Sequence, residues 1–136
     1  MGMGEAMIAI GVGCRKNCSA EDVVALVRQA LRAIDHSGEE AMLATVTGKE
    51  SEDGLHRAAQ DLNMRLTFLS IDLLKTAAPQ AQTQSARAEA LFGLPSVCET
   101  AALVGAGPQS RLILSRIKSS TVTCAIARAD HGDMQP

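Results

Sequence analysis

The sequence predicts one α/β domain built on a mixed, mainly parallel sheet of about five strands. Short apolar runs alternate with segments whose apolar residues repeat at helical spacing, a pattern typical of parallel strands joined by crossover helices. The length of 136 residues is close to the commonest domain size, and 46% apolar with 21% charged residues is ordinary for a folded domain. We therefore treat residues 1–136 as a single domain and expect the tail at 130–136 to fray.

The first half of the chain alternates strands and helices. Ser19 is placed as a helix N-cap with Asp22 at the capping-box position, and the helix behind it closes at Gly38. Helical spacing recurs over 55–62, and a short helix is expected over 72–76. Strands are predicted over residues 7–12 (MIAIGV), 41–46 (AMLATV) and 65–69 (RLTFL).

The second half begins with a Pro- and Gln-rich stretch at 77–85, which we expect to be an exposed connection. Ser85 is placed to cap a short helix that ends at Gly93. Ser96 is placed to cap another, with Gly105 as its stop. Strands are predicted over residues 111–117 and 122–127.

Composition and charge narrow the function classes. A net charge of −2 provides no global basic field for nucleic acid or anionic lipid, so an anion site would have to be local. Two Phe with no Tyr or Trp argue against recognition of single strands by aromatic stacking. No apolar run approaches the roughly 20 residues of a membrane span, and residues 1–5 do not begin like a signal peptide. We expect a cytoplasmic protein with neither nucleic-acid nor membrane partners.

The cysteines and histidines do not form a metal site in the sequence, and neither a metal nor another cofactor is expected. The four cysteines are expected to be free thiols in a cytoplasmic chain. Cys98 and Cys124 fall in apolar patterns and are expected in the core, whereas Cys14 lies beside basic residues that could acidify its thiol. The histidines are expected at the surface: His36, His56 and His131.

A glycine-containing turn after the first strand is a candidate anion site. Gly11 and Gly13 lie between a strand and a helix start, and Arg15 and Lys16 in the same turn would add charge-assisted hydrogen bonds. The alternative is a tight turn with solvated basic residues. The dinucleotide fingerprint fails here, because Lys16 occupies the position of its third glycine.

Three further residues are candidates in other loops. Lys49 follows the second strand and should lie near the first loop if the sheet is parallel, giving a cationic rim suited to a polycarboxylate. Lys118 and Thr121 lie in a Ser/Thr-rich link and are either ligand contacts or solvated turn residues. Glu99 is either a general base or the residue that completes the cap begun by Ser96, and we favour the cap.

Read together, four segments resemble the CobE proteins and the C-terminal domain of CbiG, from cobalamin (vitamin B12) biosynthesis. The segments are residues 10–20 (IGVGCRKNCSA), 45–52 (TVTGKESE), 93–103 (GLPSVCETAAL) and 118–127 (KSSTVTCAIA). The positions that match the family pattern are Gly11, Gly13, Cys14, Arg15, Ser19, Lys49, Ser96, Glu99, Lys118 and Thr123. The chain departs from the pattern at Gly48, where the family often has an acidic residue, and at Cys18, where a small or hydroxyl residue is usual. The first departure weakens a catalytic role for the loop after the second strand.

The resemblance implies a three-layer α/β/α sandwich, and the length implies the stand-alone CobE form. It implies a corrin-ring intermediate as ligand, of precorrin or hydrogenobyrinic-acid type, and other enzymes of the pathway as further partners. Such ligands carry many carboxylates, which suits a rim built from Arg15, Lys16, Lys49 and Lys118.

Three functions follow as hypotheses. The first is a protein that binds a corrin intermediate in the oxygen-dependent pathway. The second is a hydrolase-type enzyme that opens a precorrin ring-A lactone and releases a two-carbon fragment as acetaldehyde, with Glu99 and Lys118 as candidate catalytic residues. The third, a nucleotide-binding regulatory domain, rests only on the glycine turn and ranks last.

Overall fold

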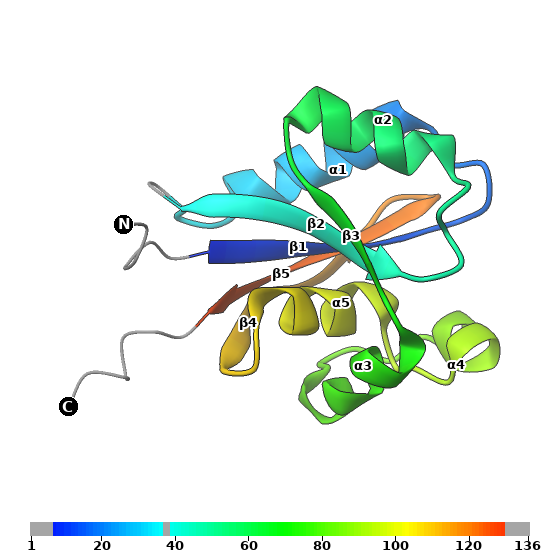
Figure 1. The fold of residues 1–136 in the computed structure, drawn as a ribbon, viewed down its shortest axis with the longest axis vertical. Coiled ribbons are helices and arrows are strands. Elements are labelled where there is room, and N and C mark those ends of the chain that lie inside the picture. Colours follow the sequence, from blue (N-terminus) through cyan, green and yellow to red (C-terminus); the bar gives the residue numbers. More distant parts are fainter. Residues whose placement is uncertain (1–6, 37–38, 130–136) are drawn as a thin grey trace.

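The computed structural model describes residues 7–36 and 39–129, so Gly38 and the tail at 130–136 lie outside the described residues. The first helix nevertheless ends at Arg32, before the stop predicted at Gly38. Within these ranges five strands and five α-helices follow one another, with one short 3-10 turn, η1 (Figure 1). The elements are β1 (Met7–Cys14), α1 (Ala20–Arg32), β2 (Glu40–Val46), α2 (Asp53–Leu62), β3 (Leu66–Leu69), α3 (Ile71–Thr76), η1 (Ala78–Gln80), α4 (Ala86–Phe92), α5 (Val97–Ala106), β4 (Ser110–Lys118) and β5 (Val122–Ala129).

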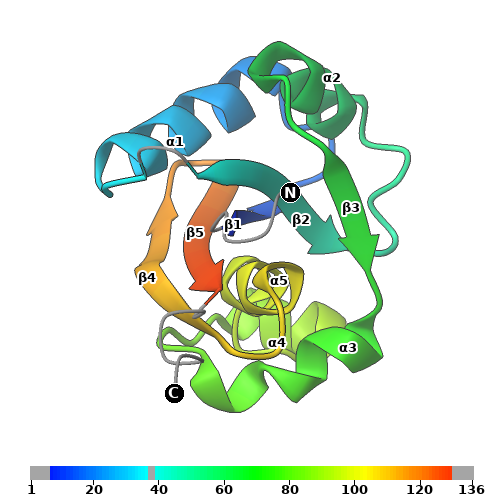
Figure 2. The same cartoon turned by 60° about the vertical axis from the view of Figure 1, so that its left-hand side comes forward.

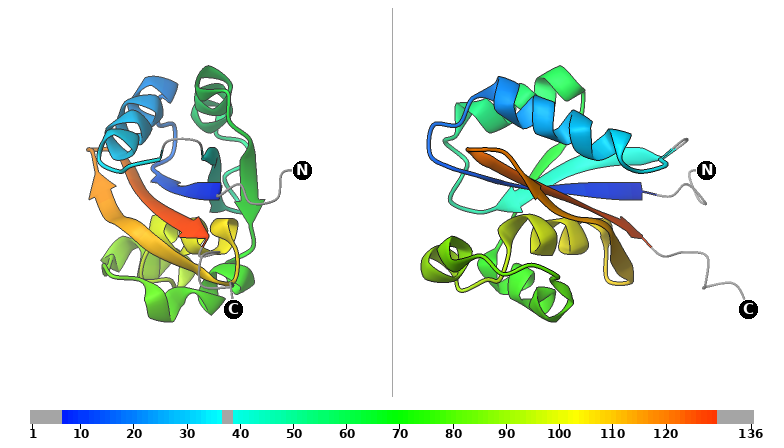
Figure 3. Two further views of the ribbon diagram at one scale, coloured as in Figure 1. Left: turned by 90° about the vertical axis from the view of Figure 1, so that its left-hand side faces the viewer. Right: turned by 180° about the vertical axis from the view of Figure 1, so that it is seen from behind.

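The sheet has the strand order β3-β2-β1-β5-β4. The first three strands are parallel neighbours, whereas β5 runs antiparallel to both β1 and β4, so four of the five strands point the same way. Helices α1 and α2 cover one face of the sheet, and α3, α4 and α5 lie on the other (Figures 2 and 3). This arrangement confirms the three-layer α/β/α sandwich with a mixed sheet.

The N-terminus of α1 is capped as its sequence predicts, but the capping box is only half formed. Ser19 Oγ accepts the backbone N–H of Asp22 at 3.1 Å. The Asp22 carboxylate does not return to Ser19; it accepts the hydroxyl of Thr121 at 3.0 Å instead. The link between β4 and β5 is thereby tied to the start of α1.

Helix α5 lies directly against the middle of the sheet because Gly11 has no side chain. Gly11 and Gly13 both lie within β1 rather than in a turn, which corrects the sequence prediction. A Cβ built at Gly11 would lie 1.8 Å from the carbonyl oxygen of Cys98, so only glycine allows this approach. The helix also continues past its predicted stop at Gly105 to end at Ala106, with Gly107 as its C-cap.

The connection between α3 and α4 is anchored rather than fully exposed. Ala77 is buried, and the N–H groups of Gln82 and Thr83 are held by the carboxylate of Glu99.

In the part of the chain that the structure describes, no helix has the length and apolarity needed to cross a bilayer.

The predicted burial is confirmed for two cysteines and the predicted exposure for one histidine. Cys98 and Cys124 are fully buried core residues, as predicted. His56 is exposed, with its Nε2 2.7 Å from the carbonyl oxygen of Glu50, whereas His36 is half-buried. His131 lies outside the described residues.

Candidate functional site

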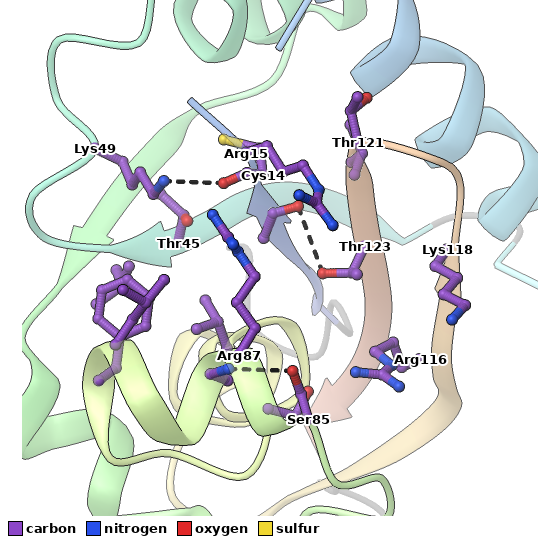
Figure 4. A pocket seen from close by; sticks show the side chains of 18 of the residues that line it. Cys14, Arg15, Thr45, Lys49, Ser85, Arg87, Arg116, Lys118, Thr121 and Thr123 are labelled. Carbon is purple, nitrogen blue, oxygen red and sulfur yellow. Dashed lines mark hydrogen bonds between the residues drawn. The ribbon is translucent and has the colours of Figure 1, made fainter. Parts of the chain in front are cut away.

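A cavity of about 620 Å³ opens where the carboxyl ends of β1 and β2 meet the link between β4 and β5 (Figure 4). Because β5 is antiparallel, its first residues lie beside the last residues of β1, with Val122 paired to Cys14. In the strand order, β2 and β3 lie on one side of β1, and β5 and β4 lie on the other. A crevice at the strand where the order changes direction is a common ligand site in α/β sheets. The volume is within the roughly 300–1,000 Å³ that is usual for ligand pockets.

Cations dominate the lining of this cavity. Five of the 13 Lys and Arg residues of the chain line it, whereas none of the lining residues that the structure describes is acidic. None of the five forms an ion pair with a described carboxylate. Among the described residues an ion pair joins Arg128 and Glu39, which do not line the cavity. The cavity is therefore a local positive region in a chain of net charge −2. The five residues are Arg15, Lys49, Arg87, Arg116 and Lys118.

The five cations come from four parts of the chain, namely the segments after β1 and β2, helix α4 and strand β4, and they line one space. Lys49 leans across from the loop after β2, and its Nζ donates to the carbonyl oxygen of Cys14 at 2.9 Å, which leaves its other two N–H groups for a ligand. Arg15 directly follows β1 and is held by its backbone N–H, which donates to the carbonyl oxygen of Thr121 at 3.0 Å. Figure 4 shows the side chain of Arg87 reaching from α4 toward the ends of β1 and β2, with Arg116 on the opposite wall.

Part of the cavity lining is an apolar patch. Leu91 and Phe92 of α4 and Val97 of α5 line it, and Leu91 is 57% exposed. An exposed large apolar side chain beside a cationic rim is typical of a site for an amphipathic ligand. Phe92 is one of only two Phe in the chain.

Three hydroxyl groups in the lining already have structural partners. Ser96 Oγ accepts the N–H of Glu99 at 3.2 Å and caps α5, and Ser85 Oγ caps α4 in the same way through the N–H of Ala88. Thr45 is fully buried and donates to the carbonyl oxygen of Val12 at 2.7 Å. The main role of these hydroxyl groups is therefore to stabilise the cavity walls, and contact with a ligand would be an additional role.

Glu99 lies behind the cavity rather than in it. Its side chain is fully buried, and it does not line the cavity. Oε1 accepts the N–H groups of Gln82 and Thr83 at 2.8 and 3.0 Å, and Oε2 accepts the N–H of Arg116 at 2.9 Å. The carboxylate therefore does not complete the capping box begun by Ser96, which corrects the favoured prediction, and its position gives it a structural role rather than that of a base.

The thiol of Cys14 is not activated. Burial, together with the side-chain hydrogen bond to Cys18, raises the pKa of Cys14 to about 12, and the opposing effect of Lys49 is smaller than either. The expected acidification by neighbouring cations is therefore wrong, because the removal of the thiol from water outweighs the charge of Lys49. A neutral thiol is a poor nucleophile, so Cys14 contributes surface to the cavity rather than reactivity.

Comparisons with known proteins decide the family. Residues 8–127 match the family described as Cobalamin synthesis G C-terminus, which covers most of the chain. The chain belongs to this family. It is 32% identical over 123 residues to the Protein CobE of Sinorhizobium sp, an alignment that covers 90% of this chain and 80% of that protein.

Two crystal structures extend the likeness to the whole fold of this family member. One is of CobE, a protein from the cobalamin (vitamin B12) biosynthetic pathway; it is 31% identical, covers 92% of each chain and superposes with a TM-score of 0.84. The other is the cobalamin biosynthesis protein chiG from Agrobacterium tumefaciens str. C58, 32% identical, with 90% of this chain and 98% of that chain covered and a TM-score of 0.70. This chain is thus a cobalamin biosynthesis protein of the CobE/CbiG type.

The structure brings most of the predicted ligand contacts of this CobE/CbiG-type protein together around one cavity. Gly11 is the first exception, since it is buried under α5, and Lys16 is the second, since it is exposed and does not line the cavity. The ones that do line it are Gly13, Cys14, Arg15, Lys49, Ser96, Lys118 and Thr121. That a ligand contacts them stays a prediction.

Sequence reasoning missed two of the cations, and each carried a usable signal. Arg87 lies in the first turn of α4, where the helix dipole disfavours a positive charge, so its presence there indicates a role outside the helix. Arg116 lies in the last third of β4, after the apolar run 112–114, and is half-buried there, so its charge needs a polar surface to face.

Proposed function

We propose that this protein binds a polycarboxylate corrin-ring intermediate, of precorrin or hydrogenobyrinic-acid type, in the oxygen-dependent cobalamin pathway. The observation that supports this most is the cavity with five cations, no acidic residue among its described lining and one apolar patch. A corrin precursor has carboxylates around its edge and an apolar face, so both kinds of surface have a counterpart on the ligand.

The energetics are adequate for recognition. Hydrogen bonds to charged groups contribute about 1.5–3 kcal/mol each, and exposed ion pairs less, about 1 kcal/mol or below. Arg15 and Lys118 are exposed and belong to the weaker kind, whereas Lys49 and Arg116 are half-buried and better shielded from solvent. Contact with Leu91 and Phe92 would add an apolar contribution that salt does not screen.

Binding is favoured over lactone hydrolysis because a general base is missing from the described lining. That lining includes no carboxylate and no imidazole, and its one thiol is held neutral. Glu99, the candidate base, has both carboxylate oxygens occupied by backbone N–H groups. Hydrolysis needs a group that takes a proton from water, and lysine side chains are normally protonated at neutral pH.

A spectral titration tests the proposal. Hydrogenobyrinic acid absorbs visible light, and its transfer into the cavity should shift the absorption bands with a saturable dependence on protein concentration. The double variant R15A/K118A removes two exposed cations and should raise Kd about 30-fold, from about 1 kcal/mol each. The matched control R28A/R57A removes two exposed arginines of α1 and α2 that do not line the cavity, and should leave Kd unchanged.

Two outcomes count against the proposal. Absence of a saturable spectral change with the wild-type protein would refute binding of this ligand class. Equal Kd values for R15A/K118A and the control would refute the cavity as its site. Incubation with a precorrin lactone and an assay for acetaldehyde separates binding from catalysis, because a protein that only binds releases none.

A cytoplasmic location forms part of the same proposal. The four cysteines are free, and free thiols are typical of a reducing compartment. Other enzymes of the pathway would then be partners for the delivery or withdrawal of the intermediate.

A further inference from the structure

Glu99 is the one fully buried charged residue among those that the structure describes, and its carboxylate is bonded only to backbone. A buried carboxyl group is costly unless its oxygens accept hydrogen bonds, and here three N–H groups satisfy them. None of these donors belongs to α5, which carries Glu99. The residue therefore joins α5 to two other parts of the chain.

The first of these parts is an irregularity in β4. Leu114 pairs with Ile126 and Ile117 with Cys124, so three steps along β4 match only two steps along β5. This count defines a β-bulge with one extra residue, and a bulge leaves backbone groups outside the ladder. The N–H of Arg116 lies within the bulge and finds its acceptor in Glu99 Oε2.

The second part is the segment just before α4. The N–H groups of Gln82 and Thr83 have no backbone acceptor in the structure and are held by Glu99 Oε1. The residues that follow form a cavity wall, from Gln84 through Arg87 to Phe92. One carboxylate thus holds the backbone of both walls, and Figure 4 shows Arg87 and Arg116 on opposite sides of the space between them.

We propose that Glu99 is a positioning residue that sets the separation and direction of the two cationic walls of the cavity, chiefly by fixing the bulge that aims Arg116 at the ligand. The inference rests on the proposed function and deepens it. Cations held in place by a buried group lose less freedom when they bind, so affinity rises without any contact between Glu99 and the ligand.

The variant E99Q tests this at the level of single atoms. Glutamine keeps the shape and one acceptor oxygen but replaces the other oxygen with an NH₂ group, which cannot accept a hydrogen bond. Whichever way the amide turns, either the N–H of Arg116 or those of Gln82 and Thr83 lose their acceptor. Amide hydrogen exchange should therefore accelerate at one of these two places in E99Q, by at least tenfold.

The matched control is T100V, which removes a fully buried hydroxyl from the same helix with little change of shape. The Thr100 hydroxyl donates to the carbonyl oxygens of Ser96 and Val97, within its own helix and cap, at 2.6 and 3.2 Å. It forms no hydrogen bond with the backbone that Glu99 holds at Gln82, Thr83 and Arg116. T100V should leave exchange at Arg116, Gln82 and Thr83 unchanged even if it lowers stability.

Titration with hydrogenobyrinic acid gives the functional result. E99Q should raise Kd about tenfold, equivalent to 1.4 kcal/mol. In an R116A background, the same change should raise Kd about threefold or less, because most of its effect passes through Arg116. An equal effect of E99Q in both backgrounds would overturn the inference, since general destabilisation acts whether or not Arg116 is present.

The outcomes separate this inference from the proposed function. If the wild-type protein does not bind hydrogenobyrinic acid, the proposed function fails. The exchange experiment then decides the positioning role alone, and unchanged exchange in E99Q overturns it. If E99Q does not fold, exchange in the wild-type protein decides: slow exchange at Arg116, Gln82 and Thr83 supports the role, and exchange as fast as in an exposed loop overturns it.

Discussion

Replacing Gly11 with alanine should loosen α5 from the sheet and lower the stability of the whole domain. The new Cβ would lie 1.8 Å from the carbonyl oxygen of Cys98 and 2.7 Å from the backbone nitrogen of Ala102. Real Cβ atoms essentially never approach a neighbour closer than 3.0 Å, so the strand and the helix would have to separate by about 1.2 Å at this point. Both atoms belong to helix backbone, and no side-chain rotation can relieve the overlap.

The cost follows from what α5 buries. Seven of its ten residues are buried, so a shift of about 1.2 Å weakens many contacts at once. Overpacking usually costs about 1–3 kcal/mol, and the rigid backbone on both sides places G11A at or above the upper end, about 3 kcal/mol. For a chain of this length that is a fall in Tm of about 10 °C.

Thermal and urea unfolding measure this cost. The control is G48A: Gly48 has a φ of +100°, but a Cβ added there would have no heavy atom within 4 Å, so alanine carries only backbone strain, about 1–2 kcal/mol. If G11A is as stable as the wild type but binds ligand more weakly, the packing argument is wrong, and Gly11 is the ligand contact that its sequence context suggests.

Three further predictions concern charge and the thiols. The Kd for hydrogenobyrinic acid should rise several-fold between about 0.05 and 0.5 M NaCl, and R87A should flatten that dependence, as measured by titration at each salt concentration. Iodoacetamide at about pH 7.5 should label Cys14 far more slowly than the unfolded chain, because burial and Cys18 raise its pKa to about 12; rapid labelling of the native protein, seen by mass spectrometry, would contradict this. Burial raises the pKa of Cys98 from 9.0 to about 11, so the neutral thiol stabilises the fold below pH 9, and this contribution should be lost between pH 9 and 11, by about 3 kcal/mol. In C98A the stability measured by urea unfolding should fall less over that range.

The fold could be predicted from local patterns because its elements are recognisable over short stretches. The apolar run of β1, the Ser19 cap of α1 and the Ser85 cap of α4 are each visible within a few residues, and each is present in the structure. The predicted end of α5 is one residue too early because Gly105 has a packing role and does not stop the helix. It allows a tight contact at the interface with the sheet, where an added Cβ would lie only 3.2 Å from the side chains of Ala9 and Ala44.

The site could be predicted only in part, because local patterns place residues at strand ends but not residues whose position depends on packing. Arg15 and Lys49 follow the parallel strands β1 and β2, and Lys118, predicted in the link after β4, is the last residue of that strand. Because β4 points the same way as β1 and β2, the sheet brings all three to one edge. The position of Arg87 depends on where α4 packs, and that of Arg116 on a bulge, neither of which has a periodicity that a sequence pattern can reveal.

Glu99 shows how a local sequence pattern can mislead when the same residue also has a partner elsewhere in the fold. The spacing from Ser96 is that of a capping box, and the backbone half of that cap is present. A cap at a solvent-exposed helix end would use the carboxylate as well, but this helix end is buried and its neighbours have backbone N–H groups without other partners. Leaving those N–H groups unsatisfied in the interior would cost more than the second half of the cap provides, so the carboxylate turns to them. The same preference explains why one carboxylate behind the cavity holds the backbone of both walls and is not available as an acidic partner for the side chain of Arg116.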